Sequence, residues 1–283
     1  MLWRDGSLHT GTQAPFDLTD RGLCLGDGLF DTALALNGRV AFEAAHIARL
    51  VAGAQSLGFH VDPAAVRTAM RALAANGSRL AIRTTATRGS GPRGLRPPAE
   101  PRPVLYATAA ASAAALAFAP LSLWPTEIAR NETSPAARLK TLGYLDAVLA
   151  ARDATASGFD EALFRNTRGH VACAGTGNLF GLFGACLVTP PLADGVLAGI
   201  VRAEILNLAP GLGLRVEERS LPVAELLRAD AVFLTNSLRL LAPVHAIGAT
   251  RFASADHSAL GYLTAALRKR VAESCDVADA EVA

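Results

Sequence analysis

Short apolar runs separated by turn residues and by helical stretches fill this chain, and this mixture constrains its fold more than any other feature. The clearest example is LFDTALALNGRVAF, from Leu29 to Phe42, in which two apolar runs flank Asn37-Gly38. That dipeptide accepts the positive φ angles of a type I′ turn, so the segment predicts a β-hairpin. Apolar residues at helical spacing then predict one helix from Glu43 to Gly58 and a second from Pro63 to about Ala75.

The rest of the chain continues the same mixture of strands and helices. Strands are predicted at Leu80 to Thr87, from Val104, and at Phe118 to Trp124, Asp160 to Arg165, His170 to Cys173, Asn178 to Phe183, Cys186 to Thr189, Leu214 to Glu217 and Ala231 to Thr235. Helices are predicted at Lys140 to Ser157, about Gly199 to Leu208, Val223 to Leu227 and from about Asp256. The first of these is expected to have its apolar face at Leu142, Leu145, Val148 and Leu149. The strands are too clustered for a plain β-α-β series, so the predicted fold class is α+β. An Ala-rich connection near Ser112 to Ala117 predicts two lobes, at residues 1–115 and 116–283.

Composition and charge exclude several classes of protein. The 283 residues are 51% hydrophobic and 18% charged, and 27 Lys and Arg oppose 25 Asp and Glu for a net charge of +2. That balance, without a basic run, excludes a nucleic-acid or anionic-membrane partner. The N-terminus has no apolar core of a signal peptide, and the most apolar stretch, Val104 to Trp124, is Ala-rich and broken by Pro120, so no membrane span is expected. A small-molecule ligand is the better expectation.

The cysteines point to a reducing compartment. They are Cys24, Cys173, Cys186 and Cys275, which lie far apart, with no CxxC pair and no histidine at metal-ligand spacing. This pattern predicts a cytoplasmic protein without a disulfide framework and without a metal site.

Only two residues are lysines, so lysine chemistry has two candidates. Lys140 follows an extended Pro/Arg stretch at the start of a predicted apolar helix, where a lysine can be held rigidly and partly desolvated, as Schiff-base chemistry requires. General burial statistics favour a solvated first-turn lysine instead. Lys269 lies in Arg268-Lys269-Arg270, a typical solvated basic end of a helix.

A series of segments, in order along nearly the whole chain, resembles one family: the class IV, fold-type IV pyridoxal-phosphate (PLP) enzymes. That family comprises branched-chain aminotransferases, D-amino-acid aminotransferases and aminodeoxychorismate lyases. The segments are DRGLCLGDGLFDT (Asp20 to Thr32), HIARL (His46 to Leu50), TRGSGPRGLRPP (Thr87 to Pro98), RLKTLGYLDAVLAARDA (Arg138 to Ala154), GHVACAGTGNLF (Gly169 to Phe180), LVTPPLADGVLAGIVR (Leu187 to Arg202) and FLTNSLRLLAPV (Phe233 to Val244). Each is weak alone, but their shared order makes a chance match improbable.

The resemblance implies a smaller N-terminal α/β lobe and a larger C-terminal lobe, with a barrel-like sheet and helices, that carries the lysine and a phosphate cup. It implies PLP as cofactor, with Lys140 at the position of the Schiff-base lysine. Cofactor-binding positions match Arg49, Tyr144, Cys173, Asn178, Gly199, Ile200, Val201 and Ser237. Substrate-binding positions match Phe30, Arg93, Leu95 and Asn236. The resemblance also implies a homodimer that takes a small amino donor and a 2-oxo acid.

The phosphate positions agree with elementary chemistry. The turn at Gly199-Ile200-Val201 opens a helix, where unpaired backbone N–H groups and the helix dipole attract an anion. The family has a threonine where Val201 stands, so backbone donors and Ser237 would contribute more here. Arg49 has the planar fork that suits a phosphate, although most arginines on helices are simply solvated. Tyr144 is expected one helical turn after Lys140, on the same face.

The loop that contains Arg93 resembles one that binds the substrate carboxylate. Arginine is the preferred bidentate partner of a carboxylate. The loop also holds Arg88 and Arg96, so a merely solvated, charged loop is an equal alternative. D-amino-acid aminotransferases have a histidine where this chain has Leu95, which weighs against strict D-amino-acid specificity.

Cys173 is the main departure from the family pattern. A family glutamate five residues before the Asn of the NLF motif pairs with the pyridine nitrogen of PLP, and that position here is Cys173. A thiol is a weak donor without charge at neutral pH, so it would leave the nitrogen mostly unprotonated. Either the electron sink is weaker, or another group substitutes, or the standard chemistry is lost. As an isolated residue, Cys173 fits a small buried apolar side chain better than a nucleophile.

Three functions follow from these residues. The first is a PLP-dependent aminotransferase that moves an amino group between an amino acid, or primary amine, and a 2-oxo acid. The second is an aminodeoxychorismate lyase, which uses the same lysine to release pyruvate and form 4-aminobenzoate. The third is a catalytically weakened PLP-binding homologue, because Cys173 replaces the glutamate. Fold-level resemblance determines the cofactor far better than the substrate.

Overall fold

The computed structural model describes residues 1–283, and its mixed helices and strands confirm the α+β class. The chain divides into two compact units. The first unit contains Met1–Ala114, Leu139–Gly143 and Val271–Val282, and the second contains Ala115–Arg138, Tyr144–Arg270 and Ala283. This division differs from lobes at 1–115 and 116–283, because both the segment with Lys140 and the segment Val271–Val282 group with the first unit.

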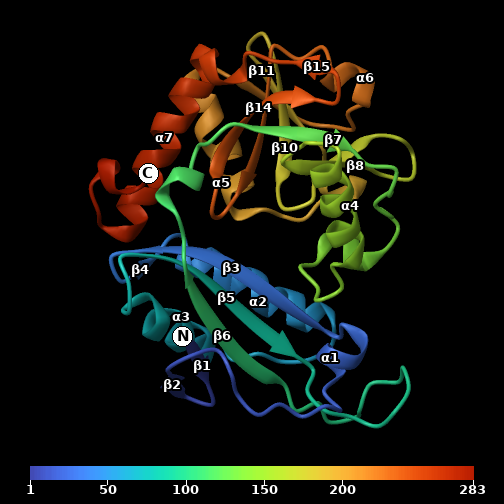
Figure 1. Cartoon of the computed structure of the whole chain (residues 1–283), viewed down its shortest axis with the longest axis vertical. Helices are drawn as coiled ribbons and strands as arrows, with labels where there is room; N and C mark the ends of the chain where they lie inside the picture. The colour runs from blue at the N-terminus through green and yellow to red at the C-terminus, as the bar shows by residue number, and fades with distance from the viewer. The chain divides into compact units, whose positions relative to one another are not determined.

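The first unit is built on a six-stranded antiparallel sheet in the order β2-β1-β6-β5-β3-β4 (Figure 1). Its strands are β1 (Leu2–Arg4), β2 (Ser7–His9), β3 (Gly28–Leu36), β4 (Arg39–Val40), β5 (Arg79–Thr87) and β6 (Val104–Ala111). The predicted hairpin is confirmed as β3 and β4, and its turn residues Asn37 and Gly38 have φ angles of 45° and 85°. Those angles are the type I′ geometry that the dipeptide favours.

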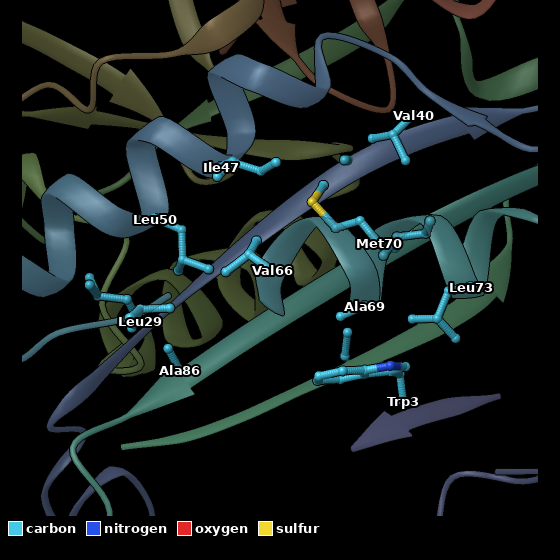
Figure 2. Close-up of a cluster of buried hydrophobic side chains, with 14 of the residues drawn as sticks. Trp3, Leu29, Val40, Ile47, Leu50, Val66, Ala69, Met70, Leu73 and Ala86 are labelled. Atoms are coloured by element: carbon cyan, nitrogen blue, oxygen red, sulfur yellow. The ribbon is translucent and has the colours of Figure 1, made fainter. Parts of the chain in front are cut away.

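Helices α2 (Glu43–Ser56) and α3 (Pro63–Ala74) cover this sheet, close to the predicted bounds. Their apolar side chains meet those of the strands in one buried cluster, drawn in Figure 2. Leu50 and Met70 come from the two helices, and Leu29 and Trp3 from the strands. Burying such side chains contributes roughly 1.5–3 kcal/mol each, so this cluster fixes β3 against α2. A short helix, α1 (Arg21–Leu25), precedes β3 and is capped by the Asp20 carboxylate.

The second unit holds a nine-stranded mixed sheet with the path β12-β11-β10-β13-β14-β7-β8-β9, and β15 pairs with β14. Its strands are β7 (Leu121–Pro125), β8 (Glu161–Arg165), β9 (Val171–Ala174), β10 (Asn178–Phe183), β11 (Cys186–Thr189), β12 (Arg215–Glu218), β13 (Ala231–Asn236), β14 (Leu240–Ile247) and β15 (Thr250–Arg251). Phe180 and Phe233 stack across β10 and β13, with ring centroids 4.8 Å apart. This contact aligns two strands whose ends carry predicted site residues.

Four helices complete the chain: α4 (Leu145–Ala156), α5 (Ile200–Leu208), α6 (Val223–Leu226) and α7 (Ser258–Cys275). None combines the length and apolar character needed to cross a membrane.

The helix predicted from Lys140 is wrong in its start and in its buried face. It begins at Leu145, because residues 140–142 pair with β3 instead. Leu145 and Val148 were expected on the apolar face, yet they are 68% and 60% exposed. The buried face consists of Ala147, Ala150 and Ala154.

Candidate active site

Lys140 lies in an extended segment alongside the start of β3. The backbone N–H of Phe30 donates to the Lys140 carbonyl at 2.9 Å, and that of Leu142 donates to the Gly28 carbonyl at 3.1 Å. The Lys140 Nζ atom is 4.4 Å from the centre of the Phe30 ring, and the Arg83 Cζ atom is 3.5 Å from the same centre. Backbone pairing and ring contact therefore hold the Lys140 amine beside Phe30, as attraction between cations and aromatic faces favours.

Arg49 is bound by a buried carboxylate on β3. Its Nε and Nη2 atoms donate to the two oxygens of Asp31 at 2.8 and 2.9 Å, and His46 Nδ1 lies 2.6 Å from Asp31 Oδ1. Burial alone would raise the pKa of Asp31, but His46 and Arg49 outweigh it and lower this pKa to about 2. Asp31 is thus an anion that orients the Arg49 fork. The role of Arg49 at a phosphate stays a prediction.

The loop with Arg93 is tied down by a buried arginine on α1. Arg21 donates from Nη1 to the Gly94 carbonyl at 3.0 Å and from Nη2 to the Leu95 carbonyl at 2.9 Å. Its Nε donates to Asp27 at 2.8 Å, which also pairs with Arg88. The side chains of Arg93 and Leu95 themselves point to solvent. Arg21 therefore fixes the backbone of the loop, whereas the side chains of Arg93 and Leu95 are exposed.

In the second unit, the start of α5 meets the ends of β10 and β13. Asn178 Nδ2 donates to the Leu197 carbonyl at 2.9 Å, which fixes the turn before the helix. A Cβ atom at Gly199 would collide with the Asn178 amide oxygen, so only glycine fits there. No side chain caps α5, and the backbone N–H groups of Ile200 and Val201 have no partner. This is an open helix end of the kind that binds anions.

A buried hydroxyl lies on β13 beside this helix end. Thr235 pairs with Asn178 across the sheet, and its Oγ1 atom is buried without a hydrogen-bond partner. Asn236 uses its amide oxygen to bind the N–H groups of Leu238 and Arg239 at 3.0 and 2.8 Å. Asn236 therefore shapes the turn that carries Ser237, immediately after β13.

Cys173 lies on β9, opposite Phe164 on β8. Its side chain is half-buried and packs against a small apolar cluster that includes Phe164. Burial raises the pKa of this thiol, although the neighbouring Arg130 opposes the shift. The sulfur is thus a neutral thiol at neutral pH.

Tyr144 does not share a helical face with Lys140, and that prediction is wrong. Tyr144 is the residue at which α4 starts, with φ −110° and ψ 15°, and the residues between it and Lys140 are not helical. The i, i+4 relation holds only within a helix.

Comparison with known proteins decides the family. The profile of the family described as amino-transferase class IV matches residues 28–247, which include Lys140 and the start of α5. The chain belongs to the class IV aminotransferase family. A Methanocaldococcus jannaschii protein, provisionally described as a branched-chain-amino-acid aminotransferase, is 31% identical over 254 residues, 87% of each chain.

Solved structures of class IV enzymes agree with this result. A 4-amino-4-deoxychorismate lyase from Pseudomonas aeruginosa is 30% identical, with a TM-score of 0.84 over 98% of this chain and 100% of that one. A branched-chain aminotransferase from Thermoproteus uzoniensis has a TM-score of 0.87 at 24% identity, over 96% of this chain and 95% of that one, and shares the fold. The chain is therefore an enzyme of this family.

The cofactor of class IV aminotransferases is PLP, and the second unit fits its phosphate. The open helix end at Gly199 supplies unpaired N–H donors. The buried Thr235 hydroxyl has no hydrogen-bond partner, and a phosphate oxygen would accept a hydrogen bond from it. Ser237 follows on the same strand end. Asn178 donates to the Leu197 carbonyl in the turn before α5, so it does not bind the N–H groups at the start of the helix.

Several residues around these positions escaped the sequence analysis. They are Arg21, Asp31, His46, Arg83, Arg130 and Thr235. A signal existed only for Asp31, an acid within an apolar strand, and for His46, on the same helix as Arg49. The other residues acquire their roles through contacts between segments far apart in the sequence.

Proposed function

We propose that this chain is a PLP-dependent aminotransferase that moves an amino group between an amino acid, or a primary amine, and a 2-oxo acid. The observation that carries the proposal is the placement of Lys140, held along β3 by Phe30 and Gly28, in a chain of the class IV family. Bound PLP supplies an aldehyde for the amino group and a ring that withdraws electrons from the substrate Cα.

Each residue has a distinct task in this proposal. The Lys140 amine would bind the cofactor and would afterwards take the proton from the substrate Cα and deliver it to the cofactor carbon C4′. The N–H groups of Ile200 and Val201 and the Ser237 hydroxyl bind the phosphate, and Arg49 adds a positive charge. Phe30 contacts the Lys140 amine with its ring and so restricts the positions that this amine can take. These tasks need only groups that the chain itself carries.

Substrate selection is assigned to the loop tied by Arg21. Arg93 binds the substrate carboxylate, Leu95 and Phe30 line the side-chain pocket, and Asn236 is assigned a polar contact to the substrate. Arg93 and Leu95 are exposed on one chain, which is consistent with a homodimer in which this loop lies against the partner. Such an interface is supported by three exposed leucines on and next to α1, namely Leu18, Leu23 and Leu25. The proposal includes a cytoplasmic location, which suits four free thiols.

The test is a transamination screen with matched lysine variants. Purified protein with PLP is given single L- or D-amino acids or primary amines together with 2-oxoglutarate, and the formation of glutamate is followed. We expect product from at least one donor, loss of product in Lys140→Ala, and retention in Lys269→Ala. PLP binding without turnover of any donor would instead support the weakened homologue.

A second candidate is an aminodeoxychorismate lyase. It is favoured by the 30% identity, over 98% of this chain, to the lyase from Pseudomonas aeruginosa. This reaction needs no 2-oxo acid. Incubation with aminodeoxychorismate alone separates the two activities, since a lyase releases pyruvate and a transaminase does not.

A further inference from the structure

Cys173 on β9 lies next to Phe164 on β8, and Arg130 lies over the Phe164 ring. Cys173 pairs with Phe164, so the two side chains lie on the same side of the sheet. Both contact a cluster that contains Ala150, Ala154 and Ala162. A charged group on this face therefore has apolar side chains beside it, and its interactions are screened less than they would be in water.

Arg130 is the charged residue on that face. Its Cζ atom lies 4.4 Å from the centre of the Phe164 ring, which pairs with Cys173 across the sheet, and its positive charge works against the rise in the pKa of the Cys173 thiol that burial causes. Its backbone N–H donates to the Arg165 carbonyl at 2.8 Å, which fixes the base of the side chain. The Arg130 Nε atom is buried without a partner. The residue thus combines a permanent positive charge with an unused donor beside the Cys173 sulfur.

Glu161 is the carboxylate that acts on the Cys173 thiol, and it is bound by other groups of the chain. Its oxygens accept from the Thr176 hydroxyl at 2.6 Å and from the Ala162 N–H at 3.1 Å. It lies close enough to Cys173 to contribute to the raised pKa of the thiol. Because the Thr176 hydroxyl and the Ala162 N–H already bind this carboxylate, the groups that remain next to Cys173 are donors.

We propose that Arg130, with Cys173 as a neutral neighbour, binds the pyridine nitrogen of PLP as its hydrogen-bond donor, so that this nitrogen is held unprotonated. The inference rests on the proposed function, because it concerns the cofactor that this function requires. A positive guanidinium disfavours a second positive charge on the ring, and an unprotonated nitrogen accepts a hydrogen bond from it.

An unprotonated pyridine nitrogen makes the reaction depend more on Lys140. An unprotonated ring withdraws fewer electrons from the substrate Cα, so proton removal there depends more strongly on the Lys140 amine. Restoring a carboxylate at position 173 reverses the arrangement, since it places an anion next to Arg130 and stabilises a protonated nitrogen.

The experiment measures the nitrogen directly. Holoenzyme is prepared with PLP that is 15N-labelled at the pyridine nitrogen, and the 15N chemical shift is recorded for wild type, Cys173→Glu, Cys173→Ser and Arg130→Gln. We expect an unprotonated shift in wild type and in C173S, and a protonated one in C173E. R130Q should move the wild-type resonance and weaken PLP binding about ten-fold, as expected for one charge-assisted hydrogen bond.

Each outcome decides a separate part of the account. A protonated nitrogen in wild type overturns the inference, even if every variant fails to fold. An unchanged resonance and unchanged PLP affinity in R130Q remove Arg130 from the arrangement. Failure of wild type to bind PLP through Lys140 overturns the proposed function as well, whereas turnover together with a protonated nitrogen overturns the inference alone.

Discussion

Replacing Asp31 with asparagine tests the buried charge cluster that orients Arg49. Asn keeps the shape of the side chain but removes the anion between His46 and Arg49, whose nitrogens lie 2.6 to 2.9 Å from its oxygens. The two basic residues then remain in contact with a neutral amide in the interior of the first unit. Removing one partner of a buried ion pair costs about 3–5 kcal/mol of the free energy of unfolding.

The dependence on pH has a defined sign. Burial works against the Asp31 anion, but His46 and Arg49 lower its pKa from 3.8 to about 2 in the folded chain. The pairing therefore stabilises the fold fully above pH 3.8 and is lost as the pH falls toward about 2. That difference corresponds to about 2 kcal/mol of the free energy of unfolding.

The assay is urea unfolding followed by tryptophan fluorescence in a Trp124→Phe background, so that buried Trp3 reports on the first unit. Asp276→Asn is the matched control, since Asp276 belongs to the first unit and pairs with Arg39 on the surface, where ion pairs contribute about 0–1 kcal/mol. The reasoning is refuted if D31N costs no more than D276N, or if D31N keeps the wild-type loss of stability between pH 3.8 and about 2.

Two further substitutions test the phosphate turn and the loop. Gly199→Ala places a Cβ atom against the Asn178 amide oxygen and should weaken PLP binding roughly ten-fold, equivalent to about 1.4 kcal/mol, in a spectroscopic titration. Gly211→Ala, whose added Cβ meets nothing, should leave that affinity unchanged, and equal effects would contradict the role of the turn. Arg21→Ala releases the carbonyls of Gly94 and Leu95, so we expect faster limited proteolysis in the loop and a higher KM with a smaller change in kcat. Wild-type cleavage rates and KM would show that the loop is held by other contacts.

Local signals in the sequence were sufficient for much of the fold. Asn37-Gly38 predicted the hairpin, and the apolar spacing of α2 and α3 placed both helices within a few residues. Strands β10 and β11 match their predicted bounds, because continuous apolar runs of that length end at turn residues.

Interactions between distant segments explain the misses. Lys140 is not helical because its carbonyl accepts from Phe30, a partner more than a hundred residues earlier that no local pattern indicates. Strand β14 was not among the predicted strands, and Pro243, which lacks a backbone donor, stands in its middle. Pro243 pairs with Phe233 there nonetheless.

The candidate site was predictable where local sequence patterns determine it, and not where distant segments meet. The local pattern of Gly199 before a helix predicted an open helix end, and the end is open in the structure. The link between Asp31 and Arg49 and the approach of Arg130 to Cys173 depend on tertiary packing, so the sequence could name the residues at 49 and 173 but not their partners.

The central claim is that Lys140 carries the cofactor. Because the chain has only two lysines, borohydride reduction of the PLP complex followed by peptide mass spectrometry gives a direct answer. The account predicts a pyridoxyl adduct on Lys140 and none on Lys269. An adduct on Lys269, or no adduct in protein that binds PLP, would contradict it.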